Sequence, residues 1–226
     1  MREFNLLGDY PDPKKPRLVG SDIRTFNHRI LATYRDKNFF DGNRNFGYGG
    51  FKYDGRWKKV ASKICKEYNL NNNSSFLQLG CEKGFLLHDI KNLYSKLDVY
   101  GLETSDYAIE NSMENVKQYI KKCENYFNFN FKNNKFDFIL ALGVVYTHDL
   151  TNAIKCIKEI QRVSKGKSFI TLASYKTKED YWLFKQWTVL GTTILLENEW
   201  AEVLKHANYT GDYYFTNAET LNLKKK

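Results

Sequence analysis

Short apolar runs alternate with segments of helical periodicity along most of this chain of 226 residues. The run Phe136–Leu142 is almost uninterrupted, which is typical of a strand covered on both faces. The segment Thr151–Val163 places isoleucines at three-residue spacing, which indicates an amphipathic helix. This regular alternation predicts a parallel sheet with helices on both faces. The expected strands are 76–79, 97–102, 136–142, 167–173, 213–215 and 220–223, and the expected helices are 56–68, 85–93, 106–121, 151–163, 179–190 and 197–207.

The first 55 residues lack this alternation and are expected to form an irregular arm. Pro11, Pro13 and Pro16 oppose helix formation, because each lacks an amide donor and restricts the residue before it. The stretch Gly42–Gly50 is too rich in glycine for a helix or a strand. The length of the chain suits one well-cored domain. We therefore expect residues 1–55 to be an arm or lid on a single domain of residues 56–226.

Charge and cysteine content narrow the classes of protein and of partner. No apolar run approaches the ~18 residues of a membrane span, and the charged start is unlike a secretory signal. Four widely spaced cysteines, with no C-x-x-C pair, favour reduced thiols in the cytoplasm over disulfides or a metal site. The formal net charge of +9 suits an anionic partner, such as nucleic acid, a phosphorylated metabolite or a nucleotide-linked sugar. A solvated, lysine-rich surface explains the same charge equally well.

The first expected strand runs into a glycine-bearing turn, Leu79–Gly84, and then into a helix. A glycine there lets the backbone approach a ligand, and the free amides of the helix start favour electronegative groups. The second strand ends at Glu103, 23 residues after Gly80, where a carboxylate can accept the hydroxyls of a ribose. The turn lacks the third glycine of a dinucleotide fingerprint, and no triphosphate-binding G-x-x-x-x-G-K-[ST] pattern occurs. These features predict a site for an adenosine-containing cofactor.

Four segments, in the expected order, resemble the motifs of class I S-adenosylmethionine-dependent methyltransferases. The match covers residues 57–174. Gln78 and Glu82 depart from the family pattern, which has an acidic residue and a glycine at these two places. The resemblance implies a three-layer, Rossmann-like α/β sandwich, with a mostly parallel seven-stranded sheet whose last strand is antiparallel. The matching segments are Phe76–Leu86 for the first motif, Val99–Ser105 for the second, Phe136–His148 for the fourth strand and its loop, and Ile157–Ile170 for the joint to the fifth strand.

The resemblance also implies which residues hold S-adenosylmethionine. Glu103 takes the place of the ribose-binding carboxylate, and Asn125 falls near the residue that lies beside the adenine. Asn125 can equally be an ordinary loop residue, and Thr104 can either sandwich the adenine or belong to the core. The departures at Gln78 and Glu82 are compatible with weaker cofactor binding or with a non-catalytic relative. The full expected set is Gln78, Gly80, Cys81, Gly84, Glu103, Thr104, Asn125 and Leu142.

The acceptor side is expected just past the fourth strand, where the reacting methyl group should point. We expect His148 to be the general base, with Tyr146 beside it, because the pKa of an unperturbed histidine suits proton removal near neutrality. His148 can instead pack on the helix below it, and Asp149 can cap that helix. The arm is expected to close over the site, with Arg56 holding the methionine carboxylate or an acceptor phosphate. Its aromatic residues can equally pin the arm on the core. The expected acceptor-binding residues are Tyr48, Tyr53, Arg56 and Tyr175.

The loop after the fourth strand also bears on the acceptor. It reads Leu142–Val145, where enzymes that methylate the amino groups of nucleobases have [DN]-P-P-[YFW]. Charge and size then favour a small polar, anionic acceptor, such as a sugar or a nucleotide-linked sugar, and methylation at oxygen. An RNA methyltransferase and a cofactor-binding but inactive module are the alternatives. We expect no metal and no membrane partner, and either a monomer or a homodimer.

Overall fold

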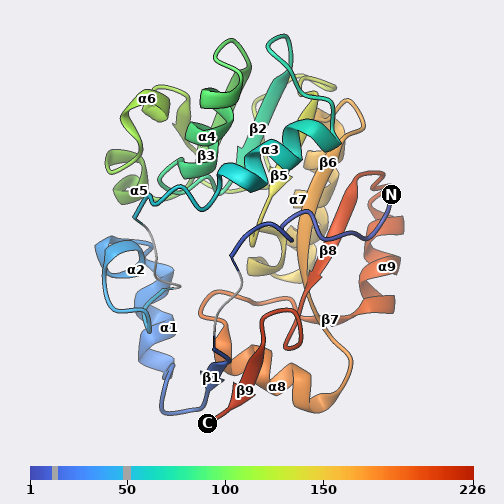
Figure 1. The fold of residues 1–226 in the computed structure, drawn as a ribbon. Helices are drawn as coiled ribbons and strands as arrows, with labels where there is room; N and C mark the ends of the chain where they lie inside the picture. The colour runs from blue at the N-terminus through green and yellow to red at the C-terminus, as the bar shows by residue number, and fades with distance from the viewer. Residues whose placement is uncertain (12–14, 48–51) are drawn as a thin grey trace.

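A seven-stranded sheet lies at the centre of the computed structural model, which describes residues 1–11, 15–47 and 52–226 (Figure 1). The strands are β2 (Ser75–Leu79), β3 (Asp98–Glu103), β4 (Ile120–Lys122), β5 (Phe138–Ala141), β6 (Ser168–Tyr175), β7 (Leu195–Leu196) and β8 (Asp212–Thr216). Their order is β4-β3-β2-β5-β6-β7, and β8 also pairs with β6. The described pairs in this sheet run parallel. Because the winding reverses between β2 and β5, a ligand is expected beyond the carboxyl ends of these strands.

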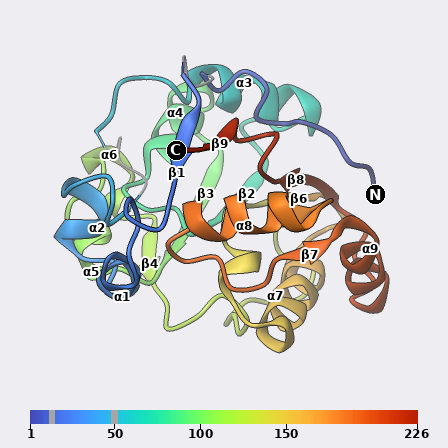
Figure 2. The same ribbon diagram turned by 90° about the horizontal axis from the view of Figure 1, so that it is seen from below.

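Helices cover both faces of the sheet, because the strands are apolar on both (Figures 1 and 2). On β2, Leu77 and Leu79 pack in the same cluster as the side chains of α7, whereas Phe76 packs with those of α3 and α4. The alternation follows from the two-residue period of a strand. No helix in the described part of the chain has the length and hydropathy to cross a bilayer. The helices after the arm are α3 (Lys58–Glu67), α4 (Phe85–Leu93), α5 (Asp106–Glu110), α6 (Glu114–Lys117), η1 (Val145–Thr147), α7 (Leu150–Val163), α8 (Lys178–Trp187) and α9 (Glu197–His206).

Most expected elements are confirmed within three residues at each end, but the expected helix 106–121 is wrong in its second half. The chain forms α5, a break, α6 and then β4. At the break, Asn111 Nδ2 donates to the carbonyl of Tyr107 at 2.8 Å, and Ser112 Oγ donates to that of Ile109 at 2.7 Å. Side chains that bond back to nearby carbonyls compete with the helix and end it here.

The last strand of the sheet runs parallel to β6, so the expectation of an antiparallel last strand is wrong. The register pairs Phe169 with Asp212 and Ala173 with Thr216. The chain reaches β8 through α8, β7 and α9, and such a crossover returns it to the end at which β6 began. The strand expected at 220–223 lies instead at β9 (Leu223–Lys225) and pairs with β1 (Arg17–Val19) in a separate two-stranded sheet.

The arm contains two helices, α1 (Phe26–Thr33) and α2 (Lys37–Asp41), so the expectation of an irregular arm is wrong for this stretch. The prolines all precede α1 and do not interrupt it. His28 Nδ1 accepts from the amide of Thr25 at the start of α1. The first residues of the chain lie on the edge of the main sheet, where Glu3 forms a parallel bridge with Tyr213. The arm is therefore packed on the core over much of its length.

Candidate functional site

Two glycines with positive φ shape the turn after β2. Gly80 has a φ of +61° and Gly84 one of +73°, a region that side chains disfavour. A Cβ on Gly80 would lie 2.8 Å from Cγ2 of Val144, in the loop after β5. The amides of Gly80 and Cys81 donate to the carbonyl of Leu102 at 2.9 and 3.3 Å. The turn therefore lies against the end of β3 and close to the loop after β5.

Glu103 ends β3, and its carboxylate is buried among backbone amides, with 0% of the residue exposed. Its Oε1 accepts from the amides of Thr104 at 2.8 Å and Ser105 at 2.9 Å. Its Oε2 accepts from the amide of Glu82 at 2.8 Å. Hydrogen bonds to a charged acceptor are stronger than neutral ones. The side chain therefore fixes the turn after β2 to the end of β3.

Two further side chains cover Glu103. Arg35, between α1 and α2, donates from Nη2 to Oε1 of Glu103 at 3.0 Å. Tyr126, in the loop after β4, places its hydroxyl 3.4 Å from the same oxygen and 3.2 Å from the amide of Thr104. The guanidinium of Arg35 also lies over the ring of Phe39, 5.1 Å from its centroid. Arg35 and Tyr126 together shield the carboxylate from solvent.

A second ion pair holds the arm segment that carries Arg35. Lys83 Nζ contacts both carboxylate oxygens of Asp41, at the end of α2, at 2.6 and 2.7 Å. Tyr107 donates to the same carboxylate at 2.6 Å. Burial raises the pKa of Asp41, but the hydrogen bonds from Lys83 and Tyr107 lower it by more, so the pKa lies below its usual value. Ser105 Oγ donates to the backbone carbonyl of Arg35 at 2.5 Å. The arm is thus joined to the core both at Arg35 and at the end of α2.

Glu82 occupies the middle of the turn with a left-handed φ of +52°, a conformation that costs a side chain roughly 1–2 kcal/mol. Burial raises the pKa of Glu82 to about 8; the nearby Arg35 opposes this shift and the charge of Glu103 adds to it. Glu82 is therefore largely protonated at neutral pH.

Two cavities meet at this edge of the sheet. The smaller one, of 170 Å³, lies between the turn after β2 and the loop after β5. The larger one, of 690 Å³, lies beside α1 and the end of α8. The two cavities adjoin, because they share Arg35, Tyr126, Thr147 and Leu190.

Comparison with known families shows the family to which this chain belongs. Residues 70–219, more than half of the chain, match a family described as a methyltransferase domain. The chain belongs to the class I S-adenosylmethionine-dependent methyltransferases. A search of curated proteins found no match for this methyltransferase.

Two of the solved structures to which the methyltransferase is similar, the first two below, share its fold. The YcgJ protein of Bacillus subtilis is 13% identical with a TM-score of 0.53, over 65% of this chain and 66% of that one. A candidate methyltransferase from Bacillus halodurans is 12% identical with a TM-score of 0.52, over 65% of this chain and 67% of that one. The [4+2]-cyclase SpnF is 15% identical with a TM-score of 0.49, over 66% of this chain and 57% of that one. The chain therefore spans no more than about two thirds of the length of these proteins.

The side chains at this edge fit the cofactor of the family, but the space is narrow. Glu103 would offer its carboxylate to the ribose hydroxyls once Arg35 is displaced, and the turn carries no Cβ at Gly80 and Gly84. Oε1 of Gln78 is buried with no hydrogen-bond partner within the described residues, and a bound group can supply one. The smaller cavity, which Arg35 lines, lies below the roughly 300 Å³ at which ligand pockets begin.

The predicted cofactor residues gather at one edge of the sheet, and their contact with the cofactor stays a prediction. Asn125 also accepts from the amide of Phe127 at 3.1 Å, which is the loop role that the sequence left open. Four of the eight line the cavities: Gly80 and Leu142 the smaller, and Thr104 and Asn125 the larger. The other four are buried at or beside the turn: Gln78, Cys81, Gly84 and Glu103.

The two predicted catalytic residues lie on different cavities. Tyr146 lines the smaller cavity and His148 the larger. Nε2 of His148 is buried and has no hydrogen-bond partner among the described residues. Burial lowers the pKa of His148, and Asp149 opposes this only in part, so the ring is neutral at pH 7. Asp149 caps α7 by accepting from the amide of Asn152 at 2.9 Å, which confirms the expectation that Asp149 caps this helix.

Three of the four predicted acceptor-binding residues are not brought to these cavities. Tyr48 lies outside the described residues. The other three do not line either cavity and have partners elsewhere: Tyr53 donates to Asp89 at 2.6 Å, Arg56 pairs with Asp54 at 2.5 Å, and Tyr175 packs on the ring of Tyr181. Arg56 is held by an acid two residues away, a local pairing that the sequence reading overlooked.

Arg35 and Tyr126 were not predicted from the sequence, although both contact Glu103. Tyr126 directly follows the predicted Asn125, so the same motif could have predicted that Tyr126 lies at the site. Arg35 gives no comparable signal, because it lies 68 residues from Glu103 in a segment outside the family motifs.

We expect Arg35→Ala to bind S-adenosylhomocysteine about tenfold more tightly than the wild type. The ribose then need not displace a charge-assisted hydrogen bond, which is worth roughly 1.5–3 kcal/mol. Isothermal titration calorimetry measures the affinity. Arg56→Ala is the control, because it removes an arginine just after the arm that pairs with Asp54 instead. Weaker binding by Arg35→Ala would mean that Arg35 contacts the ligand and does not compete with it.

We expect Glu82→Gln to stabilise the protein increasingly as the pH rises. The raised pKa of Glu82, about 8 against an ordinary 4.5, means that the wild type loses stability between these values as the pH increases. The melting temperature of Glu82→Gln should equal that of the wild type near pH 4.5 and exceed it by about 2–4 °C or more at pH 8.5. Glu202→Gln, on the exposed side of α9, should show no such trend. A constant difference at all pH values would contradict the raised pKa.

Proposed function

We propose that this methyltransferase transfers a methyl group from S-adenosylmethionine to a hydroxyl of a small, polar, anionic metabolite such as a sugar or a nucleotide-linked sugar. The observation that carries this proposal is the position of His148 on the 690 Å³ cavity, which adjoins the turn after β2. The volume of this cavity is ordinary for a site that binds a small molecule. The helix α1 supplies part of its lining through Phe26, Arg29, Ile30 and Thr33.

When bound, S-adenosylmethionine supplies an activated methyl group, which exchanges its bond to the sulfonium sulfur for a bond to the acceptor oxygen. Glu103 and the turn after β2 would hold the adenosyl part, and the arm would exclude water from the cavity. The neutral imidazole of His148 would take the proton of the acceptor hydroxyl. Because burial lowers its pKa, His148 is ready to accept a proton throughout the neutral range.

Cationic groups in the larger cavity support an anionic acceptor. Arg29 and Lys185 both line it, and Arg29 Nη2 donates to the carbonyl of Lys185 at 2.6 Å. Burial lowers the pKa of Lys185, and the charge of Arg29 adds to this effect. Arg29 is near enough for its charge to lower the pKa of Lys185, and two such cations favour a ligand that brings negative charge. An RNA acceptor is the second possibility for the same charge.

A cofactor-binding but inactive module is supported by a different observation. Arg35 occupies Oε1 of Glu103, the oxygen expected to accept a ribose hydroxyl, and Glu82 replaces the family glycine. Such a module would bind the cofactor, or its product, without turnover. Binding and turnover must therefore be measured separately.

We expect the wild type to bind S-adenosylhomocysteine and Glu103→Gln to bind it at least about tenfold more weakly. Glutamine keeps the size of the side chain but replaces a charged acceptor by a neutral one. Isothermal titration calorimetry measures both affinities, and circular dichroism confirms that the variant is folded. Glu202→Gln is the matched control, because it neutralises an exposed acid on α9. Equal affinity in the wild type and Glu103→Gln would remove the basis of the cofactor site.

We expect His148→Asn to lower the transfer rate by roughly 10²- to 10⁴-fold while leaving affinity for S-adenosylhomocysteine unchanged. The rate of the wild type should fall only below pH 6.5, because the base must be deprotonated and burial lowers the pKa of His148. A screen with radiolabelled S-adenosylmethionine against phosphorylated sugars, nucleotide-linked sugars and RNA supplies the acceptor. Preferential methylation of RNA would reverse the order of the two acceptor classes, and an unchanged rate in His148→Asn would exclude it as the base.

A further inference from the structure

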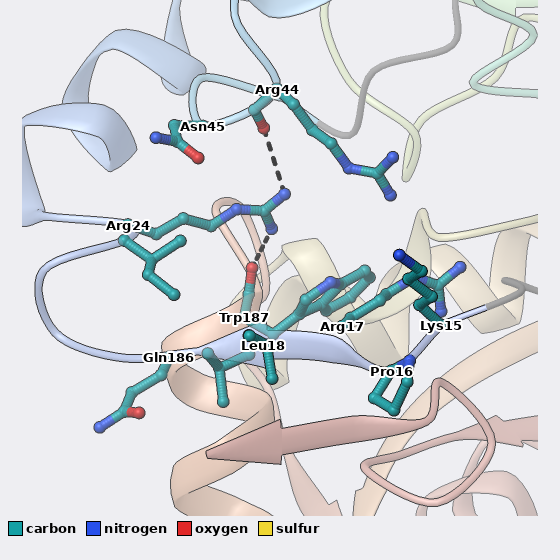
Figure 3. A pocket seen from close by; sticks show the side chains of 11 residues that line it. Lys15, Pro16, Arg17, Leu18, Arg24, Arg44, Asn45, Gln186 and Trp187 are labelled. Carbon is teal, nitrogen blue, oxygen red and sulfur yellow. Dashed lines mark hydrogen bonds between the residues drawn. The ribbon is translucent and has the colours of Figure 1, made fainter. Parts of the chain in front are cut away.

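A third cavity, of 310 Å³, lies between β1, the loop after α2 and the C-terminal end of α8 (Figure 3). We call it the cationic cavity, because four of its lining residues carry positive charge and none of the described ones is acidic. The four are Lys15, Arg17, Arg24 and Arg44.

The two exposed cations of this cavity are available to a ligand. Within the part of the chain that the structure describes, neither Lys15 nor Arg44 forms an ion pair. Figure 3 shows the side chains of Arg44, Arg17 and Lys15 reaching toward the same side of the cavity. Several like charges around one hollow create a positive potential that attracts an anion.

The two deeper cations are fixed by backbone carbonyls. Arg17 Nη1 donates to the carbonyl of Leu221 at 2.8 Å. Arg24 Nη2 donates to the carbonyls of Gly47 at 2.9 Å and Arg44 at 3.2 Å, and its Nη1 donates to that of Trp187. Arg24 is only 7% exposed. The walls of the cavity are therefore held in place before a ligand arrives, which lowers the entropy cost of binding.

The lining suits a phosphate group on a small hydroxylated molecule. A phosphate ester offers three oxygens and up to two negative charges, and guanidinium groups bind it in a bidentate manner. The side-chain amides of Asn45 and Gln186 also line the cavity and can bond to hydroxyl groups, while Trp187 adds an aromatic face. The volume lies at the low end for ligand pockets, which fits a phosphorylated monosaccharide. A nucleic-acid strand would need an open groove instead.

The cationic cavity adjoins the proposed cofactor site. Trp187 lines it and also lines the smaller cavity beside Gly80 and Glu82. We propose that the cationic cavity binds the phosphate group of a phosphorylated sugar, at a site apart from His148, whose cavity shares no described lining residue with this one. This phosphate binding does not rest on the function proposed above.

Isothermal titration calorimetry of the full chain at constant ionic strength tests this assignment, with inorganic phosphate, glucose 6-phosphate and glucose as probes. Glucose 6-phosphate should bind more tightly than phosphate, and glucose should not bind at the same concentrations. Arg44→Gln and Lys15→Gln should each weaken binding of glucose 6-phosphate about tenfold, the loss expected for one charge-assisted hydrogen bond. Lys132→Gln, which neutralises an exposed lysine outside the cavity, should change it less than twofold.

Four outcomes would overturn the proposal. These are no binding of either phosphate probe, an equal loss in Lys132→Gln, displacement of glucose 6-phosphate by S-adenosylhomocysteine, or tighter, Arg44-dependent binding of a single-stranded RNA oligomer. A separate titration with S-adenosylhomocysteine tests the proposed function independently of the phosphate site. If that ligand does not bind but glucose 6-phosphate binds in an Arg44-dependent manner, the phosphate site is supported and the proposed function fails. Retained binding of S-adenosylhomocysteine by Arg44→Gln shows that the variant is folded.

Discussion

The carboxylate of Glu103 is the charge on which the site depends. A carboxylate without solvent is costly unless donors surround it, and here three backbone amides and one guanidinium do so. Through these bonds one side chain ties together the turn after β2, the end of β3 and the arm. A ribose that takes the place of Arg35 would still donate hydrogen bonds to the carboxylate, but it carries no positive charge and would not replace the ion pair. The remaining contacts of the ligand must therefore supply the difference.

The sequence predicted the features that depend on neighbouring residues. The turn with Gly80 and Gly84, the carboxylate at the end of β3 and the cap at Asp149 all lie within a few residues of the strands and helices that position them. Both glycines adopt the positive φ for which their residue type is suited. Features of this kind can be predicted from the sequence because the residues that interact to form them are close in the chain.

Features that depend on distant partners escaped prediction. Arg35 and Glu103 are 68 residues apart in the sequence, and β1 and β9 are more than 200 apart. No pattern within a short stretch of sequence therefore indicates either contact. The direction of β8 follows from the crossover through α8 and α9 and not from its own residues. Arg56, by contrast, was expected to hold a ligand, but its ion pair is with Asp54, two residues away. Charge alone therefore does not distinguish an arginine that pairs locally from Arg35, which reaches Glu103.

Two attachments of the arm that do not involve Arg35 or α2 limit how it can move. One attachment is the bridge between Glu3 and Tyr213, and the other is the pairing of β1 with β9. The segment that carries Arg35 follows the second attachment and returns to the core at α3, so it is a closed loop and not a free tail. Most of the entropy cost of closing such a loop is met whether or not Arg35 contacts Glu103. A displaced Arg35 therefore stays within a short distance of Glu103, at a high local concentration that favours its rapid return.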